Sequence, residues 1–348
     1  MIADGGSGAG GGATDAVGGT PDLVFGRGVL AAAVSTLPRP YALVTQAEPL
    51  ESAPPALVGG AAHVAVVSSL EERVLDRLSS EVPEVGGVLG LGGGMAMDSA
   101  KFLAWRRGVS LFEAPSAVSV DACVTNTIAV RAGGRVEYRG FVVADRVFVD
   151  FDLIGTAPVQ MNRAGVGDLL SIHTALWDWR RGARHGHVQL VPSLVTRAEA
   201  VLDRIEALGE ELRDVSDRAV EVIVRAYLEI NDMAIDLGHA QVEEGSEHYF
   251  VYCLEQVAGR SFIHGEIVTL GAVLMSYLQG RRTERPIRIA QLAGVRWRPG
   301  ELGISGEELA ATLRRLPSFV REASLPYSVI NETSFDDVLI RELEELTS

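Results

Sequence analysis

Short apolar runs alternate with amphipathic segments over the first half of the chain. The runs are rich in β-branched and aromatic residues and apolar throughout, which is typical of strands in a buried parallel sheet. The segments between them place apolar residues at helical spacing. The pattern predicts strands at Tyr41–Thr45, His63–Val67, Gly86–Gly94, Ser110–Pro115 and Val147–Ile154, helices at Ser69–Ser80 and Ala96–Arg107, and a hairpin over Thr127–Arg139 with Gly133 and Gly134 in its turn.

After Pro158 the periodicity becomes helical and stays helical. We expect helices at Asp217–Gly238, Ser246–Ala258, His264–Gln279 and Gly306–Leu316, and a last helix opened by a capping box of Ser334 and Asp337. Eight of residues 1–20 are glycine, so a flexible tail is expected there. The predicted organisation is thus an α/β domain with a doubly wound, mostly parallel sheet over 21–157 and an all-α domain over 158–348.

Composition narrows the class of protein. The net charge of −15 argues against a nucleic-acid surface, which needs cationic contacts to phosphate. No apolar run reaches the ~18 residues of a membrane helix, and no basic segment precedes an apolar core as in a signal peptide. The two cysteines, Cys123 and Cys253, cannot form a disulfide framework. We therefore expect a protein of the reducing cytoplasm that binds neither nucleic acid nor membranes.

A glycine-rich turn joins a predicted strand to a predicted helix at Gly90–Lys101, GLGGGMAMDSAK. Glycine has no Cβ, so a diphosphate can approach the backbone of Gly92, Gly93 and Gly94, and the helix N-terminus offers free N–H groups. The turn predicts nucleotide binding, with a purely structural turn as the alternative. Lys101 is the one lysine among 31 basic residues, which suggests a position that needs a compact ammonium.

This segment resembles the GGGxxxDxxK motif of the iron-containing alcohol dehydrogenase and dehydroquinate synthase-like superfamily. Within that superfamily the chain is most similar to glycerol-1-phosphate dehydrogenases and glycerol dehydrogenases. The resemblance extends from about residue 21 to the end. Further motifs in the same order support it: APSAVSVDACVT (Ala114–Thr125), GVGDLLSIHTALWDWR (Gly165–Arg180), GSEHYF (Gly245–Phe250), HGEIV (His264–Val268) and YSVI (Tyr327–Ile330).

The resemblance implies a dehydroquinate synthase-like fold and a metal-dependent, NAD(P)-linked oxidoreductase. Hydride would pass between the nicotinamide and a small polyol, ketone or aldehyde, with or without a phosphate group, as in the pair glycerol 1-phosphate and dihydroxyacetone phosphate. Asp121 would hold substrate hydroxyls, and Lys101 is a second catalytic candidate. The candidates for cofactor binding are Gln46, Gly92, Gly93, Gly94, Asp98, Lys101, Ser116 and Ser119.

The resemblance also implies that Asp168, His248 and His264 bind one divalent metal ion, with Zn²⁺ expected rather than Fe²⁺. One carboxylate and two imidazoles leave a coordination position open, as catalytic zinc or ferrous sites do. His264 follows His248 by sixteen residues, and an antiparallel pair of helices can bring the two together. Glu247 and Glu266 flank these histidines and either orient the imidazoles or are exposed helix charges.

Departures from the family pattern leave alternatives open. Relatives restricted to NAD often have Asp after the first strand, whereas this chain has Gln46, so NADP(H) is allowed. Where glycerol-1-phosphate dehydrogenases usually read SHDG, this chain reads SVDA at 119–122, and Met95 replaces a frequent Lys. A specialised aldehyde or ketone reductase is therefore one alternative. A dehydroquinate synthase-like cyclase is another, although Asp168 and the single lysine count against it. We also expect a homo-oligomer.

Overall fold

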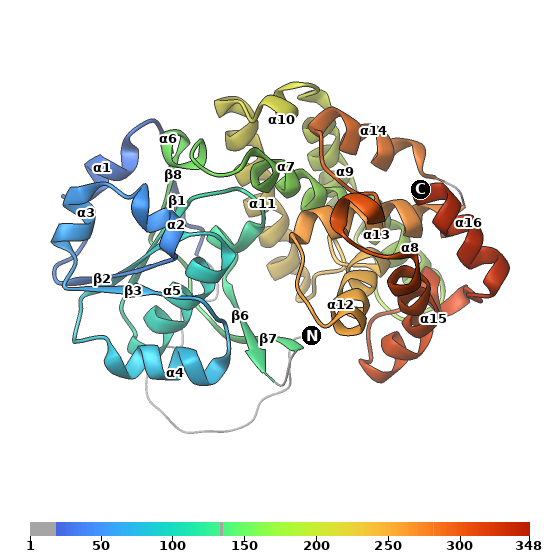
Figure 1. The fold of residues 1–348 in the computed structure, drawn as a ribbon, viewed down its shortest axis with the longest axis horizontal. Helices are drawn as coiled ribbons and strands as arrows, with labels where there is room; N and C mark the ends of the chain where they lie inside the picture. The colour runs from blue at the N-terminus through green and yellow to red at the C-terminus, as the bar shows by residue number, and fades with distance from the viewer. Residues whose placement is uncertain (1–18, 133–134, 281) are drawn as a thin grey trace. The chain divides into compact units, whose positions relative to one another are not determined.

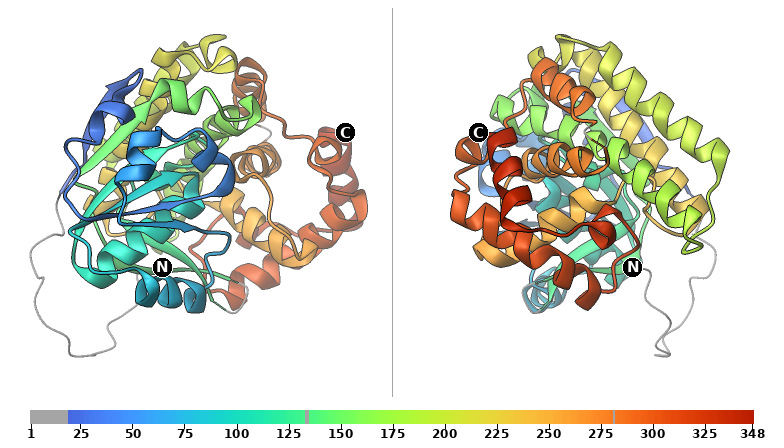
Figure 2. Two further views of the ribbon diagram at one scale, coloured as in Figure 1. Left: turned by 60° about the vertical axis from the view of Figure 1, so that its left-hand side comes forward. Right: turned by 90° about the vertical axis from the view of Figure 1, so that its right-hand side faces the viewer.

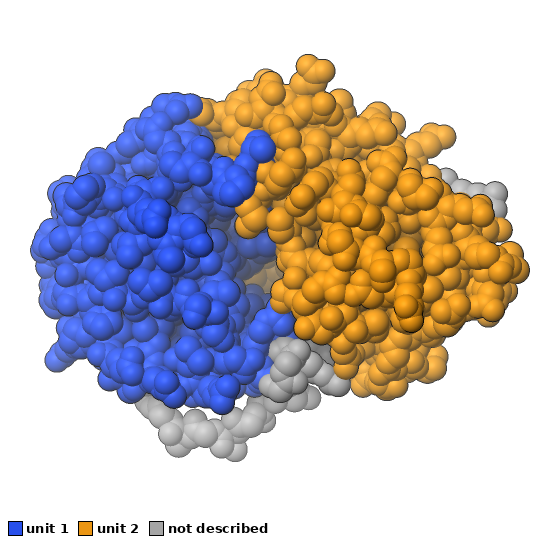
Figure 3. All heavy atoms as spheres, in the orientation of Figure 1, with its two compact units in different colours: residues 1–159 blue, residues 160–348 orange. Residues whose placement is uncertain are grey.

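The computed structural model describes residues 19–132, 135–280 and 282–348. The chain divides into two compact units, Met1–Val159 and Gln160–Ser348, which Figure 3 colours separately. Apart from residues 19 and 20, the tail predicted for residues 1–20 lies outside the described residues, as do Gly133 and Gly134 of the predicted hairpin turn.

Unit 1 is built on a six-stranded parallel sheet with the order β1-β8-β5-β4-β2-β3 (Figure 1). The chain runs outward from β2 to β3, then returns across β2 to β4 and continues in the opposite direction. The order therefore reverses between β2 and β4, where doubly wound sheets bind ligands beyond the carboxyl ends of their strands. The strands are β1 (Asp22–Gly26), β2 (Tyr41–Thr45), β3 (His63–Val66), β4 (Gly87–Gly92), β5 (Ser110–Pro115) and β8 (Arg146–Asp150).

Helices cover the sheet because its strands are apolar on both faces. Leu43, Leu89 and Phe112 pack on one face with Leu30 and Leu57 from the helices that follow β1 and β2. The opposite face packs against α5, which opens at the glycine-rich turn. The helices of unit 1 are α1 (Val29–Ala33), α2 (Ala47–Glu51), α3 (Pro55–Gly60), α4 (Glu72–Glu81), α5 (Gly94–Arg107) and α6 (Phe151–Ile154), with a 3₁₀ turn η1 at Asp121–Cys123.

An antiparallel hairpin, β6 (Thr127–Ala132) and β7 (Arg135–Phe141), packs beside α5 and α4. Ile128 and Val130 of the hairpin form a small core with Leu75 and Phe102. The hairpin thus extends unit 1 beyond the main sheet and follows directly after η1.

Unit 2 is helical, and Figure 2 shows its helices from two directions. Its main core joins α12, α13 and α15 around residues such as Phe250, Leu270 and Leu313. The elements are α7 (Val159–Leu170), α8 (Ile172–Arg184), α9 (Pro192–Ala207), α10 (Glu211–Asp214), α11 (Asp217–Leu237), α12 (Ser246–Ala258), α13 (His264–Leu278), α14 (Glu284–Ala293), η2 (Pro299–Leu302), α15 (Gly306–Glu322), η3 (Val329–Glu332) and α16 (Asp337–Thr347).

The fold predicted from sequence, a parallel α/β sheet followed by a helical part, is confirmed. Several predicted boundaries are wrong. The strand predicted at Gly86–Gly94 ends at Gly92, because α5 already begins at Gly94 instead of Ala96, and the helix predicted from Ser69 begins at Glu72. The strand at Val147–Ile154 ends at Asp150, whose side chain accepts a hydrogen bond from the N–H of Asp152 and caps α6. The last helix is capped by Asp336 instead of Ser334. Helix α15 continues past Leu316 to Glu322, because its buried stripe continues through Val320.

Among the described residues, no helix combines the length and apolar character required to cross a membrane.

Candidate metal and nucleotide sites

Three metal-ligating side chains converge in unit 2. The Nε2 atoms of His248 and His264 lie 3.6 and 3.4 Å from Oδ1 of Asp168. One ligand atom from each of the three residues falls within 4.8 Å of the others. The structure thus brings together the three residues predicted from sequence, each from a different helix: Asp168 from α7, His248 from α12 and His264 from α13.

Glycines let these helices approach closely. A Cβ on Gly265 would collide with the carbonyl oxygen of Ala164, and one on Gly167 would collide with that of Gly265. Gly271 of α13 packs against the backbone of Glu247 in α12. A Cβ at Gly271 would lie only 2.7 Å from the carbonyl oxygen of Glu247. Contact at this distance requires residues without side chains. Gly167 and Gly265 are each adjacent in sequence to a ligand, so the close crossing of α7 and α13 fixes Asp168 next to His264.

A buried carboxylate orients His248. Glu247 Oε1 lies 3.0 Å from Nδ1 of His248 and accepts a hydrogen bond from the N–H of Gly245, while its Oε2 accepts one from the hydroxyl of Thr174. A carboxylate at Nδ1 favours the tautomer with its proton there, in which Nε2, the atom facing Asp168, would be available to bind a metal. Of the two roles considered for Glu247, orientation therefore agrees with the structure. Glu266 has a different partner, because Arg296 donates to both of its oxygens.

Electrostatics in this cluster favour the charged carboxylate. Burial by itself raises the pKa of Asp168, but hydrogen bonds from His248 and His264 outweigh it and hold the pKa below its usual value. Burial by itself lowers the pKa of His248, but its contacts with Asp168 and Glu247 outweigh that effect and raise it. A divalent cation would replace the protons shared here, since an ionised carboxylate and two neutral imidazoles are the donor set that zinc and ferrous ions prefer. The residues present therefore fit such an ion.

A second buried carboxylate supports the start of α12. Asp178 accepts hydrogen bonds from the backbone N–H and the hydroxyl of Ser246, and from the N–H of Val329. Burial and the neighbouring charge of Glu247 raise the pKa of Asp178 to about 7. The sequence analysis did not single out Asp178 and Thr174, although both lie within the motif at Gly165–Arg180.

In unit 1 the glycine-rich turn lies at the reversal point of the sheet. The side-chain carbonyl of Gln46, just beyond β2, accepts a hydrogen bond from the N–H of Gly93 at 2.9 Å. The N–H of Ser116 donates to the carbonyl of Gly92, and Gly94 lies against Val120. Gly92 has φ of +153°, which side chains disfavour. The structure therefore gathers Gln46, the three glycines and the segment containing Ser116, Ser119 and Asp121.

Asp98 and Lys101 are placed differently from these residues. They lie one and two turns into α5, about 6 and 10 Å along its axis from Gly94. Their side chains are buried and paired with each other at 2.8 Å. The structure therefore puts them in the interior of unit 1, below the turn, instead of among its open N–H groups.

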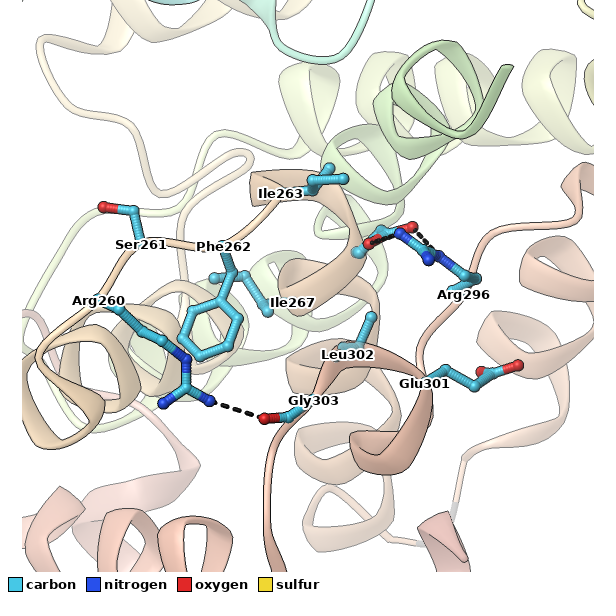
Figure 4. Close-up of a pocket in the computed structure, with 10 residues that line it drawn as sticks. Arg260, Ser261, Phe262, Ile263, Ile267, Arg296, Glu301, Leu302 and Gly303 are labelled. Carbon is cyan, nitrogen blue, oxygen red and sulfur yellow. Dashed lines mark hydrogen bonds and ion pairs between the residues drawn. The ribbon is translucent and has the colours of Figure 1, made fainter. Parts of the chain in front are cut away.

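A separate pocket of about 410 Å³ in unit 2 adjoins His264 along the chain (Figure 4). Phe262 and Ile267 form an apolar wall. Its arginines are already paired: Arg260 with Glu308 and the carbonyl of Gly303, and Arg296 with Glu266. Because these cations are neutralised, we assign the pocket no ligand.

Known proteins match both the sequence and the fold. Glycerol-1-phosphate dehydrogenase [NAD(P)+] of Hyperthermus butylicus is 29% identical over 247 residues, 70% of this chain and 69% of its own. No protein-family model matches the chain. The crystal structure of glycerol dehydrogenase from Schizosaccharomyces pombe superposes with a TM-score of 0.67 at 20% identity, covering 94% of this chain and 90% of its own. An iron-containing alcohol dehydrogenase from Corynebacterium glutamicum gives 0.70 at 15% identity, covering 94% and 95%.

This chain has the iron-containing alcohol dehydrogenase fold. Its sequence is similar to the glycerol-1-phosphate dehydrogenases, so the predicted resemblance is confirmed. The predicted NAD(P)-dependent dehydrogenase agrees with the relative from Hyperthermus butylicus, whose name includes NAD(P)+.

Proposed function

We propose that the chain is a metal-dependent, NAD(P)-linked polyol dehydrogenase that interconverts a small polyol and its carbonyl form, with glycerol 1-phosphate and dihydroxyacetone phosphate as the leading pair. The observation that carries the proposal is the convergence of Asp168, His248 and His264, with Glu247 behind His248. The sequence similarity to glycerol-1-phosphate dehydrogenases supports the substrate class.

Each group has a defined task in this proposal. A divalent ion, which we propose to be Zn²⁺, supplies Lewis acidity toward a substrate oxygen when bound. Glu247 keeps Nε2 of His248 available as a ligand. The N–H groups at the start of α5 receive the cofactor diphosphate, with Gln46 beside them. Asp121 accepts hydrogen bonds from the substrate hydroxyls and so orients the carbon that exchanges hydride.

Three further properties belong to the proposal. We propose that NADP(H) is accepted, because Gln46 places a neutral amide at the end of β2. A homo-oligomer in the cytoplasm is also proposed, and the free state of Cys123 and Cys253 agrees with a reducing compartment. The chain differs from the usual pattern of glycerol-1-phosphate dehydrogenases at Val120, Ala122 and Met95. These differences leave open whether the substrate carries a phosphate group, so the experiment below compares phosphorylated and unphosphorylated substrates.

The deciding experiment follows absorbance at 340 nm with NADH or NADPH. Dihydroxyacetone phosphate, dihydroxyacetone and a panel of small aldehydes are compared, with zinc or ferrous ion added to chelator-treated protein. We expect oxidation of the cofactor with dihydroxyacetone phosphate and loss of that rate in His264→Ala, but not in His187→Ala, which changes an exposed histidine of the same unit. A rate confined to unphosphorylated aldehydes would establish the reductase alternative, and turnover without net cofactor oxidation would establish a cyclase.

A further inference from the structure

The only lysine of the chain is a fully enclosed side chain in unit 1. Lys101 is 1% exposed. Its Nζ pairs with Oδ1 of Asp98 at 2.8 Å and donates to the carbonyl of Thr127 at 2.9 Å and to the hydroxyl of Thr125 at 3.2 Å. An ammonium has three N–H donors, and these three partners satisfy them. Burial of a charge is tolerated only with such compensation.

Asp98 completes a clamp on the same segment of chain. Its Oδ1 also accepts a hydrogen bond from the N–H of Ala129 at 3.2 Å. Asp98 and Lys101 lie on one face of α5 and both bind residues 125–129, the segment that leads into β6. We call these two side chains and their contacts with residues 125–129 the clamp. The clamp is specific to a compact ammonium, since the planar guanidinium of arginine is larger and directs its donors differently.

The clamped segment begins where the segment carrying Asp121 ends. The N–H groups of Val124 and Thr125 donate to the carbonyl of Asp121 at 2.9 and 3.2 Å. On the other side of Asp121, Val120 packs against Gly94 at the start of α5. A Cβ at Gly94 would lie only 3.1 Å from Cγ2 of Val120. Helix α5 thus holds η1 on both sides, at Gly94 near the glycine-rich turn and at Lys101 below it.

We propose that Lys101 is a positioning residue, which acts with Asp98 on residues 125–129 to set Asp121 in place relative to the glycine-rich turn. This role replaces direct contact of Lys101 with cofactor or substrate. The position of Asp121 matters to the reaction only through the proposed function, whereas the clamp itself is a property of the folded unit.

A further buried carboxyl group, that of Glu113, lies close to the clamp. Glu113 lies on β5, and its carboxyl group occupies the space beside Gly90 on the side of the sheet that faces α5. A Cβ at Gly90 would collide with this carboxyl group and with Ala100 of α5. Glu113 is 1% exposed, and neither carboxyl oxygen has a hydrogen-bond partner among the described residues. Burial raises the pKa of Glu113 well above its usual value, with Asp98 adding to the rise against the opposing charge of Lys101. Glu113 is thus a third buried titratable group beside Lys101 and Asp98.

Hydrogen exchange tests the clamp without any need for turnover. In Lys101→Met, amides in a peptide covering residues 124–130 should exchange at least ~10-fold faster, because loss of the clamp lets this segment open locally. The peptide covering β4 and the glycine-rich turn should keep its exchange rate. Arg106→Met is the matched control, since it removes an exposed cation of the same helix, paired with Asp76. Unchanged exchange at 124–130 in Lys101→Met would overturn the clamp.

The single lysine also gives a direct test of cofactor contact. Lysine labelled with ¹⁵N at Nζ yields one side-chain signal in this protein, and the shift of that signal on saturation with NADH or NADPH reports contact. We expect little change, together with acylation of Lys101 at least ~100-fold slower than that of the N-terminal amine, with or without cofactor. A large cofactor-induced shift would overturn the positioning role in favour of direct contact.

Kinetics separate this proposal from the proposed function. Lys101→Met should raise the KM for the polyol or carbonyl substrate at least ~10-fold while the Kd for NADH, measured by fluorescence, changes less than ~2-fold. The double variant Asp98→Asn with Lys101→Met removes both charges together, so it should regain thermal stability without regaining KM. Equal losses of NADH and substrate affinity would overturn positioning through Asp121. If wild-type protein turned over no substrate, the proposed function would fail, while exchange and labelling would still decide the clamp.

Discussion

The side-chain carbonyl of Gln46 accepts a hydrogen bond from the N–H of Gly93 at 2.9 Å, across the point where the strand order of the sheet reverses. The end of β2 is therefore tied to the turn that we expect to receive the cofactor diphosphate. We therefore expect this residue to affect cofactor choice through the charge of its side chain, and diphosphate binding through its hydrogen bond to Gly93.

A charged residue at position 46 should discriminate against NADPH. Gln46→Glu keeps an acceptor for Gly93 but adds a negative charge, which repels a 2′-phosphate by roughly 1–4 kcal/mol at about 4 Å. We expect kcat/KM for NADPH to fall at least ~10-fold, with NADH changed less than ~3-fold. Gln46→Ala is the matched control: it loses the hydrogen bond without adding charge, so both cofactors should weaken alike. Parallel losses in Gln46→Glu would show that residue 46 does not face the ribose.

The carboxylate behind His248 should control metal affinity. Glu247→Gln retains the size of the side chain but weakens the hydrogen bond that fixes the imidazole, a change that typically costs ~10–100-fold in metal affinity. Competition with a chromophoric chelator measures the loss for zinc. Glu266→Gln is the control: it makes the same change two residues from His264, but Glu266 pairs with Arg296 instead of with a ligand histidine. An equal loss in both variants would assign the effect to general charge instead of to the contact with His248.

The metal should be required for chemistry and not for folding. Unit 2 buries an extensive apolar core around α12, α13 and α15, so loss of one ligand leaves most of its stability in place. His264→Ala should give the wild-type circular dichroism spectrum, little bound metal by elemental analysis, and turnover reduced by at least about two orders of magnitude. Full metal content with near-normal turnover would remove Asp168, His248 and His264 as the site.

The sequence predicted those features whose signals are local. The sequence predicts a helix at Ser246–Ala258, and α12 has these bounds residue for residue, with Gly245 and Gly259 as its caps. The strand at Ser110–Pro115 is confirmed in the same way, because a buried strand between turn residues needs no distant partner to be recognised.

Features that depend on tertiary contacts were not predicted. Strand β1 was missed, because a single short edge strand such as Asp22–Gly26 carries little periodicity. The burial of Lys101 follows from the hairpin packed over α5, which the GGGxxxDxxK pattern does not contain. The three metal ligands were found through the family motifs. Their neighbours Gly167 and Gly265 were not singled out, since their role is visible only where two helices cross.

Both cysteines should be unreactive in the folded protein. Burial raises the pKa of Cys253 to about 12 and also raises that of Cys123. At pH 8 roughly one Cys253 thiol in ten thousand is then ionised, and the thiolate is the reactive form. An aromatic disulfide reagent should therefore label neither thiol within minutes at pH 8 and both in guanidinium chloride. The unfolded chain loses these thiol protons at a lower pH than the folded protein does. The free energy of unfolding should therefore fall as the pH rises above ~8.5, the ordinary thiol pKa. Rapid native labelling would contradict the burial.

The close crossing of α7 and α13 should be intolerant of a single methyl group. In Gly265→Ala the new Cβ would overlap the carbonyl oxygen of Ala164, so α13 must shift and carry His264 away from Asp168. Overpacking of this kind typically costs ~1–3 kcal/mol, which lowers Tm by roughly 2–12 °C in a unit of this size. Zinc affinity should fall with it, at least ~10-fold, although no ligand is changed. Gly300→Ala in the same unit adds a methyl group where nothing lies within 4 Å, so it should match wild type in both Tm and zinc affinity. Retention of full zinc affinity in Gly265→Ala would mean that the helix crossing does not set the distance between Asp168 and His264.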